Sequence, residues 1–358
     1  MATREQTYPG HTHSDALAAR GAPVTPVPLM QIATGFWAFK TLAAAHELDL
    51  FTRLAGDAET TAQELARELG VEQRPAEMLL TGCASLGLLE RGHHGYRNTA
   101  LSEQFLVRGT PYYFGGLVTM FDRRLYSGWA KLTEAIRTNR PTTWDPERER
   151  SMFERENPAV LEIFWEAMHS LSGFTARTLA DAIDLGAATR LLDVGGGSGA
   201  FAIELCRNYP SLCATVFDLP HVIDIAAEKI ADAELRDRVS IHGGDFFADA
   251  LPPGHDVHVY SMIMHDWNEE HDRLLLRKSF DALPNSGMII ISELLVDDDK
   301  SGPAAAALMS LNMLIETEGR NYTASEYTAW LKDAGFVEPR TVRFEAPGAN
   351  GAVIARKP

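Results

Sequence analysis

The sequence has few cysteines and no long apolar run. Among its 358 residues are only three cysteines, Cys83, Cys206 and Cys213, and they show no paired metal-binding spacing. A disulfide framework is therefore not expected, and a reducing cytoplasmic location is. No apolar run approaches the roughly 20 residues of a membrane span, and the first residues lack the apolar core of a signal peptide. The sequence thus predicts neither a membrane protein nor a secreted disulfide-rich one.

Positive charge is also scarce. Lys and Arg number 33 against 49 Asp and Glu, which gives a formal net charge of -16. Nonspecific binding to nucleic acid needs clustered cations, so no nucleic-acid partner is expected. The pair His93–His94 lies beside glycines in a polar turn, which indicates a solvated tip, and no metal site is expected.

The first hundred residues divide into an arm and a helical domain. Residues 1–28 are rich in proline and glycine and predict a flexible N-terminal arm. Residues 29–108 predict helices, interrupted near Asp49, and then the helix, turn, helix and hairpin order of a winged helix. The second of these helices carries Arg74 against Glu77 and little else that could contact DNA. We therefore favour a structural, dimer-forming role for this domain over DNA binding.

Residues 109–185 predict a helical connector. A helix from about residue 158 to 171 places apolar and aromatic side chains on neighbouring turns. With two residues that precede it, this stripe could line the floor of an aromatic pocket, although such stripes are usually plain core. The candidates are Met152, Phe153, Phe164, Trp165 and Met168.

Residues 186–358 alternate between strand-like and helix-like runs. The pattern predicts an α/β domain whose mostly parallel sheet of seven strands is covered by helices on both faces. Ligands of such sheets bind beyond the carboxyl ends of the strands. The strand-like runs are 191–194, 214–217, 239–242, 257–262, 288–294, 341–344 and 352–355.

The stretch 190–200 carries the main ligand signal. The apolar residues Leu191, Leu192 and Val194 flank Asp193, and glycines at 195, 196, 197 and 199 then force a tight turn before a helix. Gly195, Gly197 and Ala200 also satisfy the pattern of dinucleotide-binding proteins, with Asp218 at about the distance of a ribose-binding acid. A nicotinamide oxidoreductase is therefore one alternative, and the loop of S-adenosylmethionine-binding enzymes is the other.

An ordered set of motifs at the strand ends favours the second of these alternatives, although calorimetric titration with NAD and S-adenosylmethionine is what would decide between them. They are Asp193-Val-Gly-Gly-Gly-Ser-Gly, Phe217-Asp-Leu-Pro, Gly243-Gly-Asp-Phe-Phe, Met264-His-Asp-Trp-Asn-Glu-Glu, Ile290-Ile-Ser-Glu and Ala334-Gly-Phe. Behind a winged-helix segment, this set resembles the S-adenosylmethionine-dependent class I O-methyltransferases of the plant caffeate and bacterial natural-product type. The resemblance covers nearly all of the chain after residue 30. It implies a Rossmann-like seven-stranded catalytic domain, a homodimer and a small aromatic acceptor.

The resemblance also implies roles for individual residues. Asp218 is expected to bind the ribose hydroxyls of S-adenosylmethionine, Asp245 and Phe246 its adenine, and the glycine loop its amino acid end. Helix capping is the structural alternative for both acids. The full set of expected cofactor-binding residues is Asp193, Gly195, Gly197, Asp218, Leu219, Asp245, Phe246 and Ser261.

His265 matches the general base of the family, and Glu293 matches the acid that orients it. A phenol titrates near pH 10 and a histidine near 6.5, so a positioned imidazole can take the phenolic proton as the methyl group moves. Asn321 falls where plant relatives carry a second glutamate, and it cannot supply that charge. Met309, Asn312 and Met313 lie on a helix that faces the acceptor in relatives, although the sequence alone suits core equally well.

Three other activities stay open at this point. The same base could promote methylation of a ring carbon ortho to a phenol. Some members of the fold family keep S-adenosylmethionine bound without transferring its methyl group. A winged-helix DNA-binding regulator is the third possibility.

Overall fold

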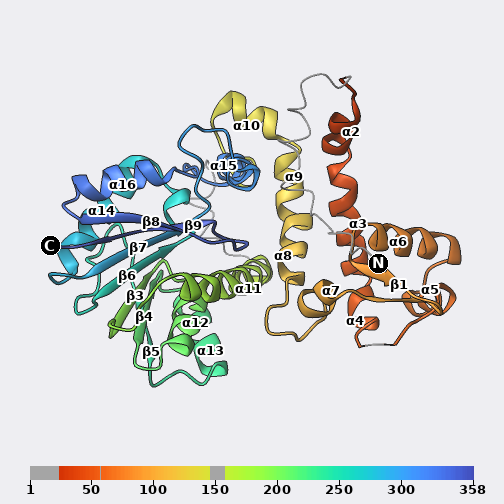
Figure 1. Ribbon diagram of the computed structural model, residues 1–358, viewed down its shortest axis with the longest axis horizontal. Helices are drawn as coiled ribbons and strands as arrows, with labels where there is room; N and C mark the ends of the chain where they lie inside the picture. Colours follow the sequence, from red (N-terminus) through yellow and green to blue (C-terminus); the bar gives the residue numbers. More distant parts are fainter. Residues whose placement is uncertain (1–23, 57, 146–157) are drawn as a thin grey trace, which may run out of the picture. The chain divides into compact units, whose positions relative to one another are not determined.

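The computed structural model describes residues 24–56, 58–145 and 158–358. The chain divides into two compact units, Met1–Val107 and Arg108–Pro358 (Figure 1). Two of the predicted pocket residues, Met152 and Phe153, lie outside the described residues. Within the described part, no helix is both long and apolar enough to cross a membrane.

The first unit has the predicted winged-helix order. The hairpin strands β1 and β2 pair antiparallel, with Leu89 opposite Asn98. The predicted helix break at Asp49 is confirmed, because this residue has a left-handed φ of 58°. The elements are α2 (Val27–Ala33), α3 (Gly35–Glu47), α4 (Leu50–Arg53), α5 (Ala62–Leu69), α6 (Gln73–Ser85), β1 (Leu89–Arg91), β2 (Tyr96–Asn98) and α7 (Ala100–Phe105).

Helix α5 begins at a capping box. The side chain of Thr61 accepts a hydrogen bond from the backbone N–H of Glu64, and the Glu64 carboxylate accepts one from the backbone N–H of Thr61. Both N–H groups would otherwise lack partners at the helix start. The Thr-x-x-Glu spacing of Thr61 and Glu64 is the sequence signature of such a box.

The second unit opens with helices. A π-helical segment, η1 (Phe121–Leu125), joins α8 (Gly115–Met120) to α9 (Tyr126–Trp129), and α10 (Leu132–Thr138) follows. The long helix α11 (Pro158–Ala182) packs against α8 and against α12 (Ala200–Asn208). These contacts place α11 beside the first turn of the α/β sheet.

Within the described residues, seven strands form one sheet in the order β5-β4-β3-β6-β7-β9-β8 (Figure 1). Strands β3 to β7 run parallel, whereas β9 is antiparallel to both β7 and β8. The strands are β3 (Arg190–Val194), β4 (Cys213–Asp218), β5 (Val239–Gly243), β6 (Val257–Ser261), β7 (Met288–Glu293), β8 (Val337–Arg343) and β9 (Gly351–Arg356). The predicted mostly parallel sheet is confirmed.

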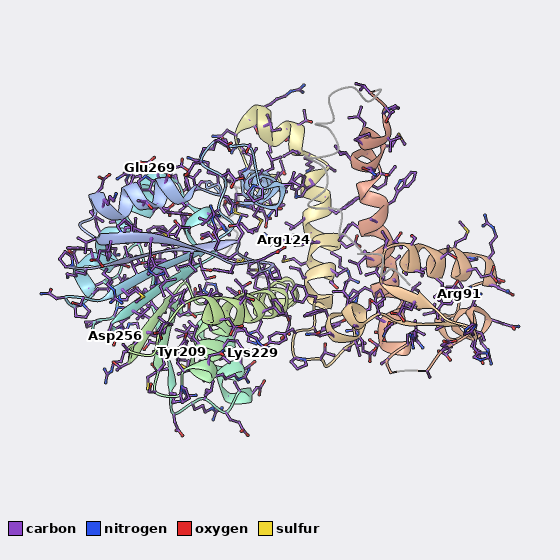
Figure 2. All side chains as sticks on the ribbon, in the orientation of Figure 1. Arg91, Arg124, Tyr209, Lys229, Asp256 and Glu269 are labelled. Carbon is purple, nitrogen blue, oxygen red and sulfur yellow. The ribbon has the colours of Figure 1, made fainter. Side chains whose placement is uncertain are left out.

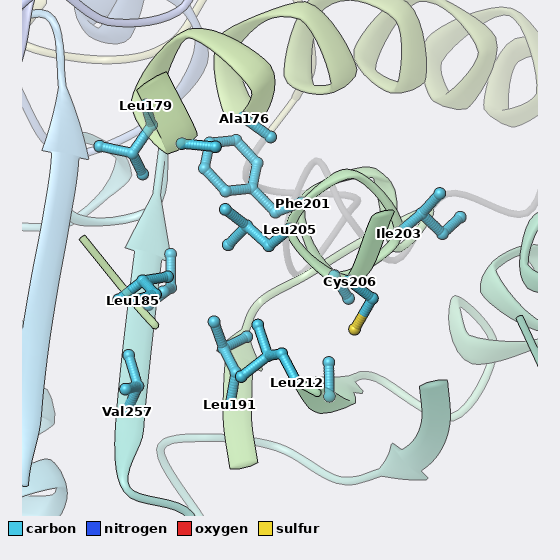
Figure 3. Packing of buried hydrophobic residues seen from close by; sticks show 14 of the residues in the cluster. Ala176, Leu179, Leu185, Leu191, Phe201, Ile203, Leu205, Cys206, Leu212 and Val257 are labelled. Atoms are coloured by element: carbon cyan, nitrogen blue, oxygen red, sulfur yellow. The ribbon is translucent and has the colours of Figure 1, made fainter. Parts of the chain in front are cut away.

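Helices cover both faces of this sheet. Successive residues of β3 point to opposite faces of the sheet, and both faces are apolar. Leu191 belongs to the apolar cluster under α11 and α12, and Leu192 belongs to the cluster on the opposite face. Figure 3 shows the first cluster, in which Leu191 and Val257 of the sheet lie near Phe201 and Leu205 of α12. The remaining helices are α13 (Ile223–Asp232), η3 (Met264–Asp266), α14 (Glu269–Ala282), α15 (Ala304–Glu316) and α16 (Ala324–Asp333).

Strand β3 is the point at which the strand order reverses, because β4 and β5 lie on one side of it and β6 on the other. The start of β3 is fixed by Asp256, labelled in Figure 2, whose carboxylate accepts hydrogen bonds from the backbone N–H groups of Thr189 and Arg190, both at 2.9 Å. Ligands of open α/β sheets bind beyond the carboxyl ends of strands at such a reversal. A ligand site is therefore expected at the turn after Val194.

Candidate active site

The turn after β3 requires glycine at two positions. Gly195 has a φ of 69° and Gly197 a φ of 54°, in the left-handed region that other residues rarely adopt. A Cβ at Gly195 would lie 2.6 Å from Ile263, and one at Gly197 would lie 2.5 Å from the Trp165 ring. The backbone N–H of Gly195 donates to the carbonyl of Phe217 at 2.8 Å, which holds the turn against β4.

Asp218, the last residue of β4, faces this turn. Its Oδ2 accepts a hydrogen bond from the N–H of Gly197 at 2.7 Å, and its Oδ1 accepts one from the N–H of Leu219 at 2.7 Å. Burial raises the pKa of Asp218, while the two backbone hydrogen bonds lower it. Each carboxylate oxygen has more than one lone pair, so a carboxylate held in this way can still accept from a diol.

The side chain of Asp193 contacts the helix that follows the turn. Its side chain is 2% exposed, and its Oδ2 accepts a hydrogen bond from the N–H of Ala202 in the first turn of α12 at 3.2 Å. A Cβ at Gly196 would lie 2.7 Å from the same oxygen. Burial raises the pKa of Asp193 to about 7, and the hydrogen bond from Ala202 lowers it in part. The structure thus gives Asp193 the helix-capping contact, and its predicted contact with the cofactor stays a prediction.

The other predicted cofactor residues follow β5 and β6. The Oδ1 of Asp245 accepts from the N–H of Phe247 at 2.8 Å, so this acid also shapes its own loop. Phe246 lies 3.4 Å from the Cβ position of Gly195 and packs edge-on against Trp267. Ser261 ends β6, and its Oγ is buried without a hydrogen-bond partner among the described residues.

His265 and Glu293 form a buried pair at the same edge of the sheet. The Nδ1 of His265 lies 2.6 Å from Oε2 of Glu293, and the two residues are 3% and 1% exposed. The other oxygen of Glu293 accepts hydrogen bonds from the N–H groups of Ile263 and Met264, both at 3.1 Å. A carboxylate only accepts, so in the neutral imidazole Nδ1 carries the hydrogen and Nε2 has the lone pair. The nearest oxygen of Asp266 is 3.7 Å from Nε2, too far for a hydrogen bond.

The electrostatics of this pair favour a strong base. Burial lowers the pKa of His265, but the charges of Glu293 and Asp266 and the hydrogen bond to Glu293 outweigh it and raise the pKa to about 9. Burial raises the pKa of Asp266 to about 7, with the charge of His265 opposing it. The imidazole is thus more basic than an ordinary histidine.

The predicted pocket residues of α11 separate into two groups. Trp165 lies on Gly197 and therefore on the glycine turn. Its ring meets that of Phe164 edge-on at 5.0 Å, and Phe164 packs instead with an apolar cluster that includes Met120 and Leu125 of the preceding helices. Met168 is half-buried.

The predicted residues of α15 are buried or half-buried. Asn312 is 8% exposed and accepts a hydrogen bond from the indole N–H of Trp129 at 2.9 Å. Met313 is 4% exposed, and Met309 packs against an apolar cluster of Leu294, Val296 and Ala306. Their predicted contact with an acceptor stays a prediction.

Asn321, where plant relatives have glutamate, binds backbone instead of the imidazole. Its Nδ2 donates to the carbonyl of Leu294 at 2.8 Å, and its N–H donates to Ser310 Oγ at 3.0 Å. Its Oδ1 is buried and has no partner within the described residues. Among the described contacts of the imidazole, Glu293 alone is a carboxylate at hydrogen-bond distance.

Sequence reasoning missed two residues near the site. His169 of α11 lies 2.8 Å from the hydroxyl of Ser198 in the glycine turn, and burial lowers its pKa to about 4. Arg124 of η1 forms a buried ion pair with Glu316. The one available signal was that His169 follows Trp165 by one helical turn and so lies on the same face of the predicted helix.

The site suits S-adenosylmethionine. The glycine turn leaves no room for side chains, as a ligand passing close to backbone requires, and Asp218 offers acceptors for a ribose diol. The indole N–H of Trp165 and the hydroxyl of Ser261 are buried without a partner in the described part of the chain, so a ligand with polar ends could satisfy them. In the described part, no three His, Cys, Asp or Glu residues are grouped to hold a metal.

The sheet order and the glycine turn define a class I S-adenosylmethionine-dependent methyltransferase, and human N-acetylserotonin methyltransferase in complex with S-adenosylmethionine has the same fold. The two structures align with a TM-score of 0.84 at 30% identity, over 94% of this chain and 99% of that one. Residues 129–337 match the O-methyltransferase domain, and residues 30–108 match the O-methyltransferase dimerisation domain. The chain therefore belongs to the O-methyltransferase family, as the strand-end motifs predicted.

Two curated relatives extend the similarity along the whole chain. The 3-hydroxy-5-methyl-1-naphthoate 3-O-methyltransferase of Streptomyces sahachiroi is 54% identical over 93% of this chain and 95% of its own. The tetracenomycin polyketide synthesis 8-O-methyl transferase of Streptomyces glaucescens is 36% identical over 97% of this chain and 99% of its own. The protein is an S-adenosylmethionine-dependent methyltransferase, which confirms the predicted enzyme class and cofactor.

Proposed function

We propose that the protein methylates a phenolic hydroxyl of a small fused-ring aromatic natural product, with His265 as general base. The acceptor class is supported by the two relatives, which are named for a hydroxynaphthoate and a polyketide. The base is supported by one observation above all, the buried 2.6 Å contact between His265 and Glu293. That contact fixes the imidazole so that Nε2 is the nitrogen able to take a proton.

Residues of this chain provide binding and proton transfer. S-adenosylmethionine would supply an electrophilic methyl group, and cleavage of its sulfur–carbon bond would leave S-adenosylhomocysteine. Asp218 accepts from the ribose hydroxyls, Gly195 and Gly197 leave room for the amino acid end, and Trp165 covers the same turn. His265 takes the phenolic proton at Nε2 as the new oxygen–carbon bond forms, because a phenolate is a far better nucleophile than a phenol.

The raised pKa of His265 suits this proton transfer. A phenol has a pKa near 10, and an imidazolium with a pKa of about 9 is a nearly matched partner. The pKa of an ordinary histidine, near 6.5, lies roughly 3.5 units below that of the phenol, so it would be a less well matched base. Because of this raised pKa, most enzyme molecules carry a protonated imidazole at pH 7. The rate of methyl transfer should therefore increase with pH towards 9.

Replacement of His265 tests this role. We expect His265→Ala to lower kcat by about 100- to 10,000-fold, the usual contribution of a general base, with the affinity for S-adenosylhomocysteine changed less than threefold. 3-Hydroxy-1-naphthoic acid is a suitable acceptor, and NMR of the product locates the methyl group. Full turnover by the variant would contradict the role of His265, and a methyl group on ring carbon would contradict O-methylation.

We also propose a homodimer formed through residues 30–108, which match the family's dimerisation domain. Apolar side chains on α2 and α3 support it, since Ile32 is 70% exposed and Trp37 61% exposed. Sedimentation of the wild-type chain should give a dimer, and Ile32→Glu with Trp37→Glu should give monomers. A monomeric wild-type protein would refute this proposal. The predicted cytoplasmic location and the absence of a nucleic-acid partner stay predictions.

A further inference from the structure

Arg124 is a buried cation that neither the base nor the glycine turn explains. It lies on η1, the π-helical segment between α8 and α9, and is labelled in Figure 2. Its side chain is 12% exposed. π-Helical turns are rare, and those that occur lie frequently at functional sites. A guanidinium is costly to bury unless nearby groups compensate its charge.

The contacts of this guanidinium include a carboxylate and an aromatic ring. Its Nη2 lies 3.0 Å from Oε1 of Glu316, whose side chain is 6% exposed. Its Cζ lies 5.6 Å from the centre of the Phe164 ring. Phe164 is one of the residues expected to floor the acceptor site. The charged head is therefore oriented by a carboxylate and an aromatic ring at a point where an aromatic acceptor is expected.

The partner of Arg124 is tied to the segment that carries the base. Glu316 ends α15, which packs against η3, the short helix that contains His265. Three residues further on, the Cβ position of Gly319 lies 2.1 Å from the carbonyl oxygen of His265, so the chain after α15 lies directly on the backbone of the base. The pKa of Asp266 responds to both Glu316 and Arg124, although burial has a larger effect on it.

The end of α15 is also fixed from its other side. The carbonyl of Ile315 accepts hydrogen bonds from the N–H and the hydroxyl of Thr143, and the carbonyl of Glu316 accepts one from the indole N–H of Trp144 at 2.7 Å. Glu316 thus has a rigid backbone from which to orient Arg124. A planar guanidinium has five N–H donors in a fork, so one arginine can bind two carboxylates at once.

We propose that Arg124 is a specificity-determining residue that binds a carboxylate of the acceptor, with Glu316 as the residue that positions it. The acceptor class is then a hydroxylated aromatic acid, its hydroxyl at Nε2 of His265 and its carboxylate at Arg124. This inference rests on the proposed function, which requires only a phenol. It adds that the anionic group of the acceptor is recognised, and that the uncharged phenol of the same ring system is a poor substrate.

A matched pair of acceptors tests it. 3-Hydroxy-1-naphthoic acid and 2-naphthol share the ring system and the hydroxyl, and they differ by the carboxylate. Charge-assisted hydrogen bonds contribute about 1.5 to 3 kcal/mol, or roughly 10- to 150-fold. We expect the wild-type enzyme to prefer the acid by at least 10-fold in kcat/KM, mostly through KM. Arg124→Met should remove this preference and change turnover of 2-naphthol less than threefold.

Controls separate recognition from folding. Arg124→Met leaves Glu316 buried without its ion-pair partner, so the double variant with Glu316→Gln is measured alongside, together with the melting temperature of each. Arg124→Lys should keep part of the preference, and Arg123→Met, at the exposed neighbouring arginine, should keep all of it. Calorimetric Kd values for both acceptors, in the presence of S-adenosylhomocysteine, should follow the same order.

Each contrary result has a distinct meaning. If the wild-type enzyme methylates both acceptors equally, or if the variants lose both in parallel, Arg124 is structural and the inference is wrong, while the proposed function stands. If neither acceptor is bound or methylated although S-adenosylhomocysteine binds, the fused-ring phenol class itself is wrong, and carboxylate recognition is refuted with it.

Discussion

Replacing Glu293 by glutamine should move the hydrogen of the neutral His265 imidazole from Nδ1 to Nε2. Both oxygens of Glu293 act as acceptors, Oε2 for His265 and Oε1 for the N–H groups of Ile263 and Met264. A glutamine amide has one oxygen and one NH2 group and can satisfy only one of these sides. Two backbone donors outnumber one ring nitrogen, so the oxygen should stay with the backbone and the NH2 group should face Nδ1. The imidazole then carries its hydrogen on Nε2, where the phenolic proton must go.

The expected loss follows from this geometry. A base in the wrong tautomer, without a carboxylate to stabilise its protonated form, loses about 100- to 10,000-fold in kcat. The pH profile should change as well. In the wild-type enzyme the acidic limb of kcat/KM should lie near the raised pKa of His265, about 9. Without Glu293, burial is the main remaining effect and lowers this pKa, so the limb should move to lower pH while the maximum falls.

The assay measures transfer of a labelled methyl group to 3-hydroxy-1-naphthoic acid between pH 6 and 10. The chain offers a matched control, because His271 and Glu318 also lie 2.6 Å apart but are 40% and 46% exposed. Glu318→Gln should therefore leave kcat and its pH dependence within twofold of the wild type. A Glu293→Gln enzyme that keeps kcat within fivefold, or an acidic limb that does not move, would refute the reasoning.

Three further changes test the site and the fold. Gly197→Ala puts a Cβ 2.5 Å from Trp165 at a φ of 54°, which should cost about 1–2 kcal/mol in the free energy of unfolding and weaken S-adenosylhomocysteine at least 10-fold by calorimetry; unchanged binding would contradict a ligand at this turn. Asp218→Asn replaces one of two acceptors held at 2.7 Å by an NH2 group, and its Kd for S-adenosylhomocysteine should increase at least 10-fold, whereas an equal Kd would exclude the ribose contact. Thr61→Ala removes the capping side chain of α5 and should lower the free energy of unfolding by about 1 kcal/mol in denaturant titrations, without changing kcat; a loss of activity at full stability would be the contrary finding.

Local sequence patterns predicted the elements well because they depend on neighbouring residues. Strand runs bounded by glycine, and the capping residue Thr61, report on contacts within a few positions of the chain. The pair His265 and Glu293 was also found, because His265 follows β6 and Glu293 ends β7, and these parallel strands end at the same edge of the sheet. Their motifs, together with the family resemblance, supplied what spacing alone could not.

Contacts that depend on packing between distant elements were not predictable from such patterns. His169 reaches Ser198 because α11 packs on α12, and Arg124 reaches Glu316 because α9, which directly follows η1, packs against α15. Asp193 is a further case, because the glycine motif did not show that its carboxylate binds the backbone N–H of Ala202, and its predicted contact with the cofactor stays a prediction. Asp193 lies within β3, and only the fold shows that its side chain reaches the first turn of α12.

Strand β9 lies between β7 and β8, and this arrangement constrains how the enzyme is made. Gly351 pairs with Glu293, and the N–H of Asn350 donates to the carbonyl of Glu293 at 3.0 Å. The backbone that carries the orienting carboxylate is thus completed by residues that the ribosome adds nearly sixty positions later. A nascent chain can fold its glycine turn early, but it can become active only after residues 350–356 have emerged and inserted. Nonsense mutations just before them should give proteins that are both inactive and prone to aggregate, because the edge of β7 is left open.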